Sequence, residues 1–364
     1  MSSALFSPIS LAGLTLANRL VVSPMCQYSA DDGCANDWHL MHLGMLANSG
    51  AGLVVVEATH IERHARITHG CLGLYSDDNE AALARVIGQC RRAGTSKFGI
   101  QIAHAGRKAS AQKPWDGAGP LAEDADPWQT VAASAIPFGD KWHTPREATE
   151  ADLERIRAAF VSAVQRAVRI GFDAIELHMA HGYLLHGFMS PLSNKRTDQY
   201  GGSFENRMRF PLSVARAVRA VVPKGLPLGA RITGSDWREG GLTPDDAVAV
   251  AKALKAEGLE FICVSSGGNA ADIRNPTEQG FNVANAARIK KEAGIATRAV
   301  GLIVRAEHAE EIVAKGEADQ VALGRGFLDD PHWGWHAAKA LGAEVARPQQ
   351  YARAAPKMWA PAAK

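Results

Sequence analysis

The sequence lacks the features of secreted, membrane-spanning and disulfide-bonded proteins. Only 5 of its 364 residues are cysteine, an odd number with no C-x-x-C pair, so neither disulfides nor a thiolate zinc site is expected. No apolar run reaches the length of about 18 residues that a membrane helix needs. The opening MSSALFSPISLAGL has no basic stretch before its apolar residues, unlike a secretory leader. We therefore expect a cytoplasmic protein with no membrane partner.

Excess charge of one sign is also missing. The 40 basic and 38 acidic residues leave a net charge of +2, and no Lys/Arg block occurs, which argues against a nucleic-acid partner. Neither G-x-G-x-x-G nor the P-loop pattern is present, which disfavours an open nucleotide-binding sheet. With 46% hydrophobic and 21% charged residues, the composition is typical of a globular protein.

What is present is a regular alternation of apolar runs with segments of helical periodicity. The predicted strands are 20–25, 53–58, 98–103, 174–178, 228–233, 261–264, 299–303 and 320–323. The predicted helices are 38–48, 79–93, 151–170 with Thr149 as cap, 204–222, 244–257 with Thr243 as cap, 282–293, 306–315 and 332–341. Eight strands that each precede a helix predict a closed (β/α)₈ TIM barrel, because parallel strands need crossover helices.

The chain is longer than the roughly 250 residues of a plain barrel. We expect a single domain, 1–364, with a short N-terminal segment. An excursion after the third strand, insert 107–149, is expected to cap the barrel mouth, and a C-terminal tail, 343–364, follows the last helix.

Polar residues at the predicted strand ends are mostly hydrogen-bond donors, and chemistry in such barrels lies at this end. Lysine is absent from the strand exits and carboxylates are sparse, which disfavours a Schiff base and an oxygen-ligand metal site. The donors suit an anionic, planar, phosphorylated ligand. Arg231 lies within a buried strand and needs an anion, either such a ligand or, structurally, Glu57.

The segment IELHMAHGYLLHGF places three histidines and a tyrosine after the fourth strand. His178, His181 and His186 keep a zinc site open as an alternative, although H-E-x-x-H is absent. A non-catalytic or metal-dependent barrel that binds a phosphorylated metabolite is therefore the alternative function. His186 alone is expected to cap or pack, and Trp38, His39 and His42 are expected to pack in the core.

The chain resembles the Old Yellow Enzyme family of FMN-dependent ene-reductases. The likeness rests on LANRLVVSPMCQYSA, IQIAHAGRKA, DAIELHMAHGYLLHGFMSPLSNKRTDQYGGSFENRMRF and VALGRGFLDDP. Cys26, Tyr28 and the ending PQQYARAAPKMW are similar to the branch with YqjM and xenobiotic reductase A. The resemblance implies ping-pong reduction of the activated C=C bond of α,β-unsaturated carbonyl compounds, and of nitro compounds, with FMN and NADPH, NADH being possible.

The resemblance also implies residue roles. Contacts to FMN are implied for Ser23, Pro24, Met25, Cys26, Ala58, Gln101, His178, Arg231, Gly301, Gly324 and Arg325. His178 and His181 would hold the substrate's carbonyl oxygen as charge develops on it, and Tyr183 would donate the proton. Tyr28 would line the pocket, and Cys26 would tune the flavin.

The same likeness implies a homodimer or homotetramer in which the tail of one subunit lies near the neighbouring site. Arg353 is the residue expected to reach a substrate in this way, with Trp359 as a weaker match.

Overall fold

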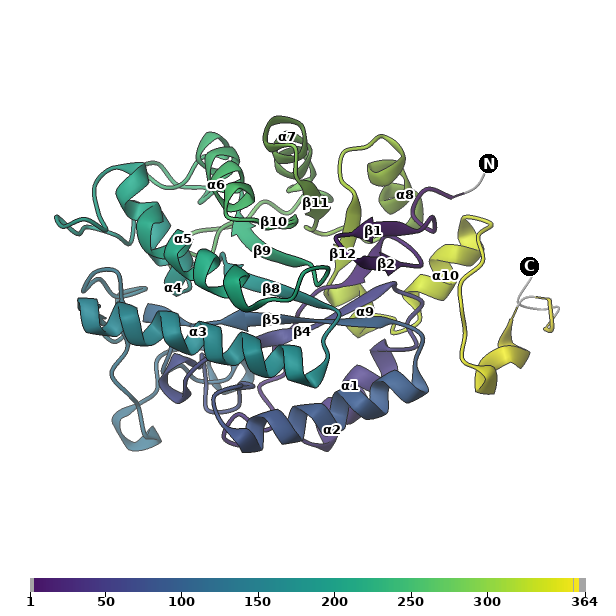
Figure 1. Cartoon of the computed structure of the whole chain (residues 1–364), viewed down its shortest axis with the longest axis horizontal. Helices are drawn as coiled ribbons and strands as arrows, with labels where there is room; N and C mark the ends of the chain where they lie inside the picture. The colour runs from purple at the N-terminus through teal and green to yellow at the C-terminus, as the bar shows by residue number, and fades with distance from the viewer. Residues whose placement is uncertain (1–2, 356, 360–364) are drawn as a thin grey trace.

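The fold is a closed barrel of parallel strands, as the sequence predicts. A computed structural model of the chain describes residues 3–355 and 357–359. The barrel strands follow one another in the order β10, β11, β12, β3, β4, β5, β8 and β9. Their bounds are Leu20–Val22 (β3), Leu53–His60 (β4), Lys97–Ala103 (β5), Ala174–Met179 (β8), Leu228–Thr233 (β9), Phe261–Ser265 (β10), Ala296–Ala299 (β11) and Gln320–Leu323 (β12). Figure 1 shows the helices arranged around this sheet.

The helices connect successive strands on the outside of the barrel. They are Asp37–Leu46 (α1), Asp77–Ala93 (α2), Glu150–Ile170 (α3), Leu184–Met189 (α4), Phe204–Val221 (α5), Pro244–Ala256 (α6), Val283–Ala293 (α7), Ala306–Ala314 (α8), Arg325–Asp329 (α9) and Trp333–Ala340 (α10). Both predicted caps are confirmed, because Thr149 and Thr243 form reciprocal capping boxes with Asp152 and Asp246. α4 was not predicted, since its six apolar and histidine residues are too few for a helical period.

Two predicted strands are wrong at their ends. The first stops at Val22, shortly before Pro24, which has no N–H to donate to a neighbouring strand. The seventh is β11, Ala296–Ala299, rather than 299–303. The apolar residues after Ala299 form a loop, in which Gly301 and Leu302 have φ of 116° and 53°. Arg298 lies inside the barrel on β11, a position that a hydrophobic pattern assigns to an apolar residue.

An antiparallel hairpin, Ile9–Leu11 (β1) with Leu14–Leu16 (β2), precedes the barrel. Leu16 is buried in one cluster with Val21 and Leu53, which lie where their strands begin. The hairpin therefore covers the N-terminal end of the barrel. The opposite end, where the strands stop, carries the polar residues.

The insert 107–149 contains short elements only. They are the 3₁₀ turns Gly106–Lys108 (η2), Pro114–Asp116 (η3) and Glu123–Ala125 (η4), and the paired strands Val131–Ala132 (β6) and Arg146–Glu147 (β7). Trp115 meets Tyr28 edge to face, with ring centroids 5.9 Å apart. The insert thus contacts the chain that leaves the first barrel strand. Its role as a cap, like the single-domain organisation, stays a prediction.

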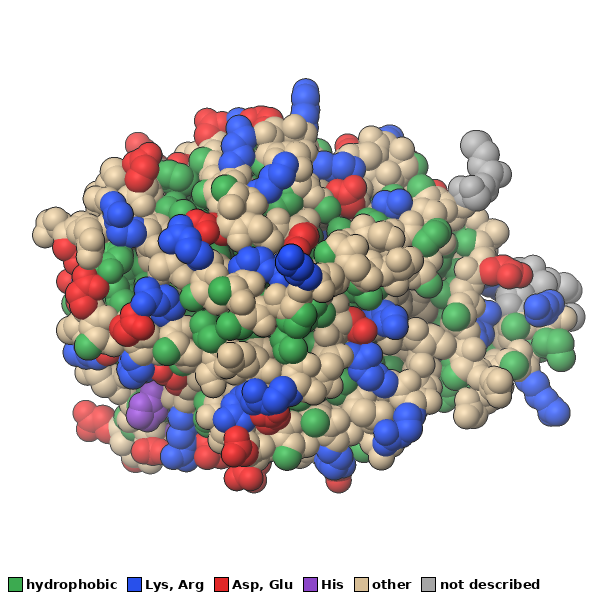
Figure 2. All heavy atoms as spheres, in the orientation of Figure 1, with side chains coloured by type: hydrophobic (Ala, Val, Ile, Leu, Met, Phe, Trp, Pro, Cys, Tyr) green, Lys and Arg blue, Asp and Glu red, His purple; other side chains and the backbone are tan. Residues whose placement is uncertain are grey.

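The C-terminal tail projects from the side of the barrel (Figure 1). After α10 it holds one 3₁₀ helix, Gln349–Ala354 (η5). Residues 356 and 360–364 of the predicted tail lie outside the described residues. On the face that Figure 2 shows, basic and acidic side chains are interspersed over the barrel. Among the described helices, none combines the length and hydrophobicity needed to cross a bilayer.

Candidate active site

Two arginines and one glutamate meet inside the barrel. Glu176 on β8 lies 3.0 Å from Arg298 Nη1 and 3.6 Å from Arg231 Nε. Gln101 on β5 donates to the same carboxylate at 2.7 Å. Because two guanidinium groups share one carboxylate, the interior of the barrel favours a further negative charge.

Arg231 is anchored on three sides. Its Nε donates to Cys263 Sγ at 3.3 Å, and its Nη2 donates to Ser23 Oγ at 3.4 Å. Burial opposes its charge, but the neighbouring Cys263 and Glu176 raise the pKa of the guanidinium. Glu57, the structural partner suggested from the sequence, is not that partner. It lies 3.6 Å from His39 and accepts from the Gln27 amide, on the side of β4 that faces α1.

Three aromatic side chains gather at the end of β8. The His178 ring lies 5.2 Å from the His181 ring and 4.8 Å from the Tyr183 ring, both edge to face. His178 is also the register partner of Arg231 on β9. The structure therefore brings together the two histidines, the tyrosine and the interior arginine.

The surroundings of these rings set their protonation. Burial, and then the neighbouring His181, lowers the pKa of His178 well below its usual range. Burial, with Arg231 and Lys108 nearby, does the same for His181. Burial raises the pKa of Tyr183 well above that of free tyrosine. At neutral pH the site thus holds two neutral imidazoles and a protonated phenol, all able to donate hydrogen bonds.

His181 has a partner that the sequence analysis did not assign. Ser265, the last residue of β10, places its Oγ 2.6 Å from His181 Nε2. Its position at a strand end was the available signal, but a serine there has many uses. The contact joins the ends of β8 and β10 through the ring.

Lys108 was also missed, because it follows β5 by a 3₁₀ turn rather than standing at the strand exit. Its ammonium donates to the carbonyls of His181 and Gly268 at 2.8 and 3.0 Å. It lies 4.8 Å from the Tyr183 ring centre and 4.5 Å from that of Phe138. Burial, with Arg107 nearby, lowers the pKa of Lys108 to about 7.

Residues after β3 form the neighbouring wall. Cys26 and Tyr28 pack, with Tyr183, against a small apolar cluster around Cys71. Burial, followed by the negative charge of Glu57, raises the pKa of Cys26 well above its usual range. Burial likewise raises the pKa of Tyr28. Cys26 is thus held as a neutral thiol rather than as a reactive thiolate.

The ends of β11 and β12 supply backbone and unpaired amide groups. A Cβ on Gly324 would stand 3.4 Å from Met25 Sδ, so strand β12 ends against the residues that follow β3. Beside Gly301, the fully buried Asn282 has no hydrogen-bond partner at Nδ2 or Oδ1 among the described residues. Buried amide groups need partners, so this end fits a polar ligand. Arg325 follows Gly324 as the first residue of α9 and is exposed.

The other predicted site residues lie around the same rim. Ser23 and Ala58 are buried at the ends of β3 and β4, and Pro24 and Met25 are partly buried beside them. The prediction of core packing is confirmed for two of three residues on α1 and is wrong for the third. His39 and His42 on α1 are buried, but Trp38 is 48% exposed, because its indole turns outward to bond Gln27.

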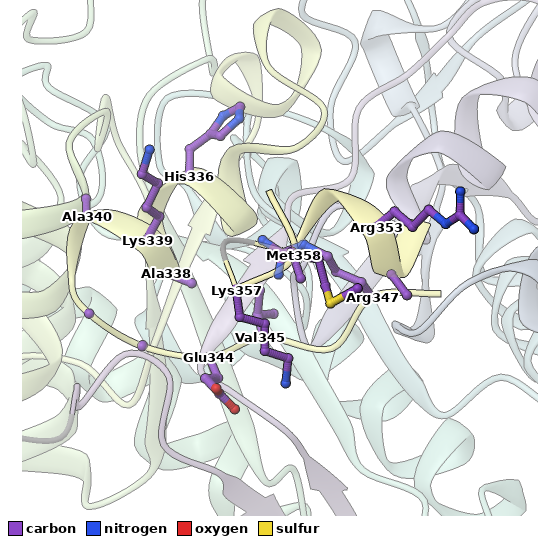
Figure 3. Close-up of a pocket in the computed structure, with 14 residues that line it drawn as sticks. His336, Ala338, Lys339, Ala340, Glu344, Val345, Arg347, Arg353, Lys357 and Met358 are labelled. Carbon is purple, nitrogen blue, oxygen red and sulfur yellow. The ribbon is translucent and has the colours of Figure 1, made fainter. Parts of the chain in front are cut away.

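Arg353 is not brought to this cluster within the chain. It lies on η5 and lines a pocket of about 1090 Å³ between α10 and the tail. Figure 3 shows its side chain extending away from Glu344 and Val345 on the same tail. None of the other predicted site residues lines that pocket. Trp359 is 54% exposed.

His186 faces Asp236 at 3.3 Å instead of joining the other two histidines as a ligand. Within residues 3–355 and 357–359, no group of three or more His, Cys, Asp or Glu side chains is arranged to hold a metal ion.

Comparison with known proteins gives consistent matches. The sequence profile of the NADH:flavin oxidoreductase / NADH oxidase family matches residues 4–344. An NADPH dehydrogenase of Geobacillus thermodenitrificans is 43% identical over 355 residues, which cover 97% of this chain and 99% of that protein. An NADPH dehydrogenase of Listeria innocua is 42% identical over 354 residues, with the same coverage.

Solved structures show the same barrel. Morphinone reductase superposes with a TM-score of 0.77 at 27% identity, over 96% of this chain and 92% of that one. A 2-naphthoyl-CoA reductase superposes with a TM-score of 0.84 at 23% identity, over 93% of this chain. This chain spans 52% of the length of that reductase, so the likeness concerns the fold of its barrel part.

Proposed function

Since the chain belongs to the NADH:flavin oxidoreductase / NADH oxidase family and is an FMN-dependent NADPH dehydrogenase, we propose that it reduces the activated C=C bond of α,β-unsaturated carbonyl compounds. The resemblance to Old Yellow Enzyme drawn from the sequence is confirmed by these matches, and so is the assignment as an enzyme. Nitro compounds are proposed as further acceptors, because their oxygens can occupy the same donor site.

The rim of the barrel fits FMN. Arg231 and Gln101 would hold the polar edge of the ring beside the interior charge cluster. Ser23, Gly301, Gly324 and Arg325 would surround the remainder, where Asn282 still offers unpaired groups. Bound FMN supplies the hydride transfer, first from NADPH and then to the alkene.

One observation carries the proposal: His178, His181 and Tyr183 converge beside Arg231. The two neutral imidazoles each present an N–H, and together they would hold the carbonyl oxygen of an enone while negative charge grows on it. Fixed neutral donors suit this task, since they stabilise the charge without giving up a proton.

Tyr183 would deliver the proton to the α-carbon. Its raised pKa keeps the phenol protonated at neutral pH, so the proton is available for transfer. Lys108, 4.8 Å from the ring centre, would stabilise the phenolate that remains after the transfer.

We also propose that subunits associate through the tail. Tyr351, Met358 and Trp359 are 49%, 65% and 54% exposed, which is unusual for large apolar side chains so close in sequence. A neighbouring subunit would cover them and receive Arg353. Light scattering of the full chain and of a chain ending at Gly342 tests this; an unchanged mass would count against it. The cytoplasmic location stays a prediction.

The function is tested by the two half-reactions of pure holoprotein, followed by its yellow absorbance. His178→Ala and His181→Ala should each slow reoxidation by an enone by about 10²- to 10³-fold, because each removes one oxyanion donor. His336→Ala, on the surface of α10, is the control. Enone reoxidation at the normal rate in both variants, with FMN still bound, would refute the proposal.

A further inference from the structure

The segment that carries His181 and Tyr183 is a left-handed corner. His181 has φ of 61° and Gly182 has φ of 75°. A non-glycine residue in this region persists only when its surroundings hold it there, at a cost of about 1–3 kcal/mol. The corner therefore needs anchors, and they determine where the imidazole and the phenol point.

Besides its own turn bond from the Tyr183 amide to the Ala180 carbonyl at 3.3 Å, the backbone of the corner is held by hydrogen bonds to three side chains. The His181 amide donates to Thr233 Oγ1 at 3.2 Å, and the His181 carbonyl accepts from Lys108 at 2.8 Å. The Gly182 amide donates to His186 Nδ1 at 2.7 Å. Gly182 lies between the two functional residues, so the third bond fixes both of them.

That third bond specifies the proton on His186. Because Nδ1 accepts, the neutral ring carries its hydrogen on Nε2. His186 Nε2 faces Asp236 Oδ1 at 3.3 Å, and both side chains are completely buried. Neither atom has a hydrogen-bond partner among the described residues, so the two form a close polar contact rather than a well-aligned hydrogen bond.

Asp236 is fixed in turn by its other oxygen. Oδ2 accepts from Ser190 Oγ at 2.6 Å and from the Leu242 amide at 2.9 Å. Oδ1 is thereby left to face the histidine. Burial opposes the charge of this carboxylate, but His186 and these donors lower the pKa of Asp236 to about 2. A carboxylate accepts only, so it selects the Nε2–H form of the ring.

We propose that His186 and Asp236 are positioning residues for the proton donor and the oxyanion histidine. Asp236 sets the tautomer of His186, and His186 holds the Gly182 amide. This places His181 and Tyr183 at the substrate. With the opposite tautomer, an N–H on Nδ1 would face the Gly182 N–H, and the corner would lose its anchor. The inference rests on the proposed function for the roles of His181 and Tyr183.

Four variants separate positioning from packing. His186→Asn keeps an acceptor near the place of Nδ1, whereas His186→Gln keeps a polar group toward Asp236 and loses that acceptor. His186→Leu loses both. Asp236→Asn replaces one carboxylate oxygen with an NH₂ group, which can only donate. If this group faces the Leu242 amide, that amide loses its acceptor; if it faces His186, the ring must change its tautomer.

We expect His186→Gln, His186→Leu and Asp236→Asn to lower kcat for an enone by about 10- to 100-fold, the usual effect of a displacement near 1 Å. The solvent deuterium isotope effect on kcat should rise in the same variants, because proton delivery from Tyr183 becomes limiting. His186→Asn should retain kcat within about threefold of wild type. Equal losses in His186→Asn and His186→Gln, with no change in the isotope effect, would show a packing role and overturn the inference.

A second measurement does not depend on turnover. Nitrogen-15 spectra of histidine-labelled holoprotein should show His186 protonated at Nε2 in wild type, with the Gly182 amide slow to exchange. Asp236→Asn should shift the ring toward the other tautomer and speed that exchange. A wild-type ring protonated at Nδ1 would overturn the inference. If wild type fails to reduce enones while the spectra are as expected, the proposed function fails and the anchoring of the corner stands.

Discussion

The corner at the end of β8 and the C-terminal tail are built in opposite ways. His181, Gly182 and Tyr183 are held by side chains from β8, β9, η2 and α4, through hydrogen bonds and a ring contact. The described part of the tail, 343–355 and 357–359, exposes Tyr351, Met358 and Trp359 and places Arg353 away from that corner. One chain therefore brings together the proposed hydrogen-bond donors by itself, whereas the role proposed for the tail needs a second subunit.

The difference follows from where the anchors come from. The corner is fixed by groups on separate barrel elements, so closing the barrel orders it. The tail follows the last barrel helix, and under the proposed association a neighbouring subunit would order it. Variants in the corner should therefore have the same effect at every protein concentration, whereas the effect of variants in the tail should depend on protein concentration. Four predictions test this contrast.

The largest effect is expected for the proton donor. Tyr183→Phe should lower kcat for an enone by about 10²- to 10⁴-fold, since it removes the proposed general acid and keeps the ring. Reduction of the enzyme by NADPH needs no such proton and should stay near the normal rate. Stopped-flow traces of both half-reactions measure this. Tyr351→Phe on the tail is the matched control; equal losses in both variants would remove the distinction between the regions.

The buried interior should also dominate the response to acid. Burial lowers the pKa of His60 on β4 from 6.5 to about 4. As pH falls below 6.5, His60 becomes protonated in the unfolded chain but stays neutral in the folded one. Its contribution to the free energy of unfolding is therefore fully present above pH 6.5 and is lost between pH 6.5 and pH 4. The loss is about 3 kcal/mol from this residue.

Urea unfolding at pH 7.5 and pH 4.5 checks this. His60→Asn should weaken the pH dependence, because the amide can still donate to the Leu72 carbonyl but cannot be protonated. The exposed His336→Asn should leave the dependence unchanged. The interpretation is wrong if both variants keep the wild-type slope.

A smaller effect is expected at Lys108. Lys108→Met should slow the enone half-reaction by about tenfold, since it removes a cation near the Tyr183 ring and one anchor of the corner. With a pKa of about 7, the wild-type lysine is charged below pH 7 and neutral above it. The enone rate should therefore fall as pH rises through 7, and this inflection should vanish in the variant. Lys113→Met, over Trp115 in the insert, is the control. If the inflection near pH 7 remains in Lys108→Met, it arises from another group.

The smallest effect is expected for the tail. Arg353→Ala should raise KM for the enone by about threefold, as for an exposed charge, and only at concentrations where subunits are associated. Steady-state kinetics across a dilution series measure it. A loss of activity above about 100-fold at every protein concentration would mean that Arg353 acts together with His181 and Tyr183 within one chain, and the contrast between the two regions would be wrong.

The sequence predicted the elements well where periodicity was strong. Helix ends agree within two residues, as at 151–170 against Glu150–Ile170, because the capping residues are local signals. The seventh strand was misplaced because the apolar run after Ala299 reads as a strand, while the true strand contains Arg298. Its charge is tolerated through Glu176, a partner on a distant element that no local pattern reveals.

The candidate site shows the same limit. The histidine pair and Tyr183 stand close in sequence, so their convergence could be foreseen, although their roles stay proposals. Ser265 and Lys108 reach the corner from other elements, and only the closed barrel brings them there. His186 was expected to cap or pack; its bond to the Gly182 amide depends on the left-handed turn between them.

The corner also meets the loop after β10 with main chain against main chain. A Cβ on Gly182 would stand 2.8 Å from Asn269 Cα, and one on Gly268 would stand 3.0 Å from His181 Cα. No side chain separates the two main chains, and the Lys108 ammonium bridges them by donating to the carbonyls of His181 and Gly268. Libraries that vary positions 182 or 268 should therefore yield mostly inactive clones, because a side chain there would collide with the opposite main chain.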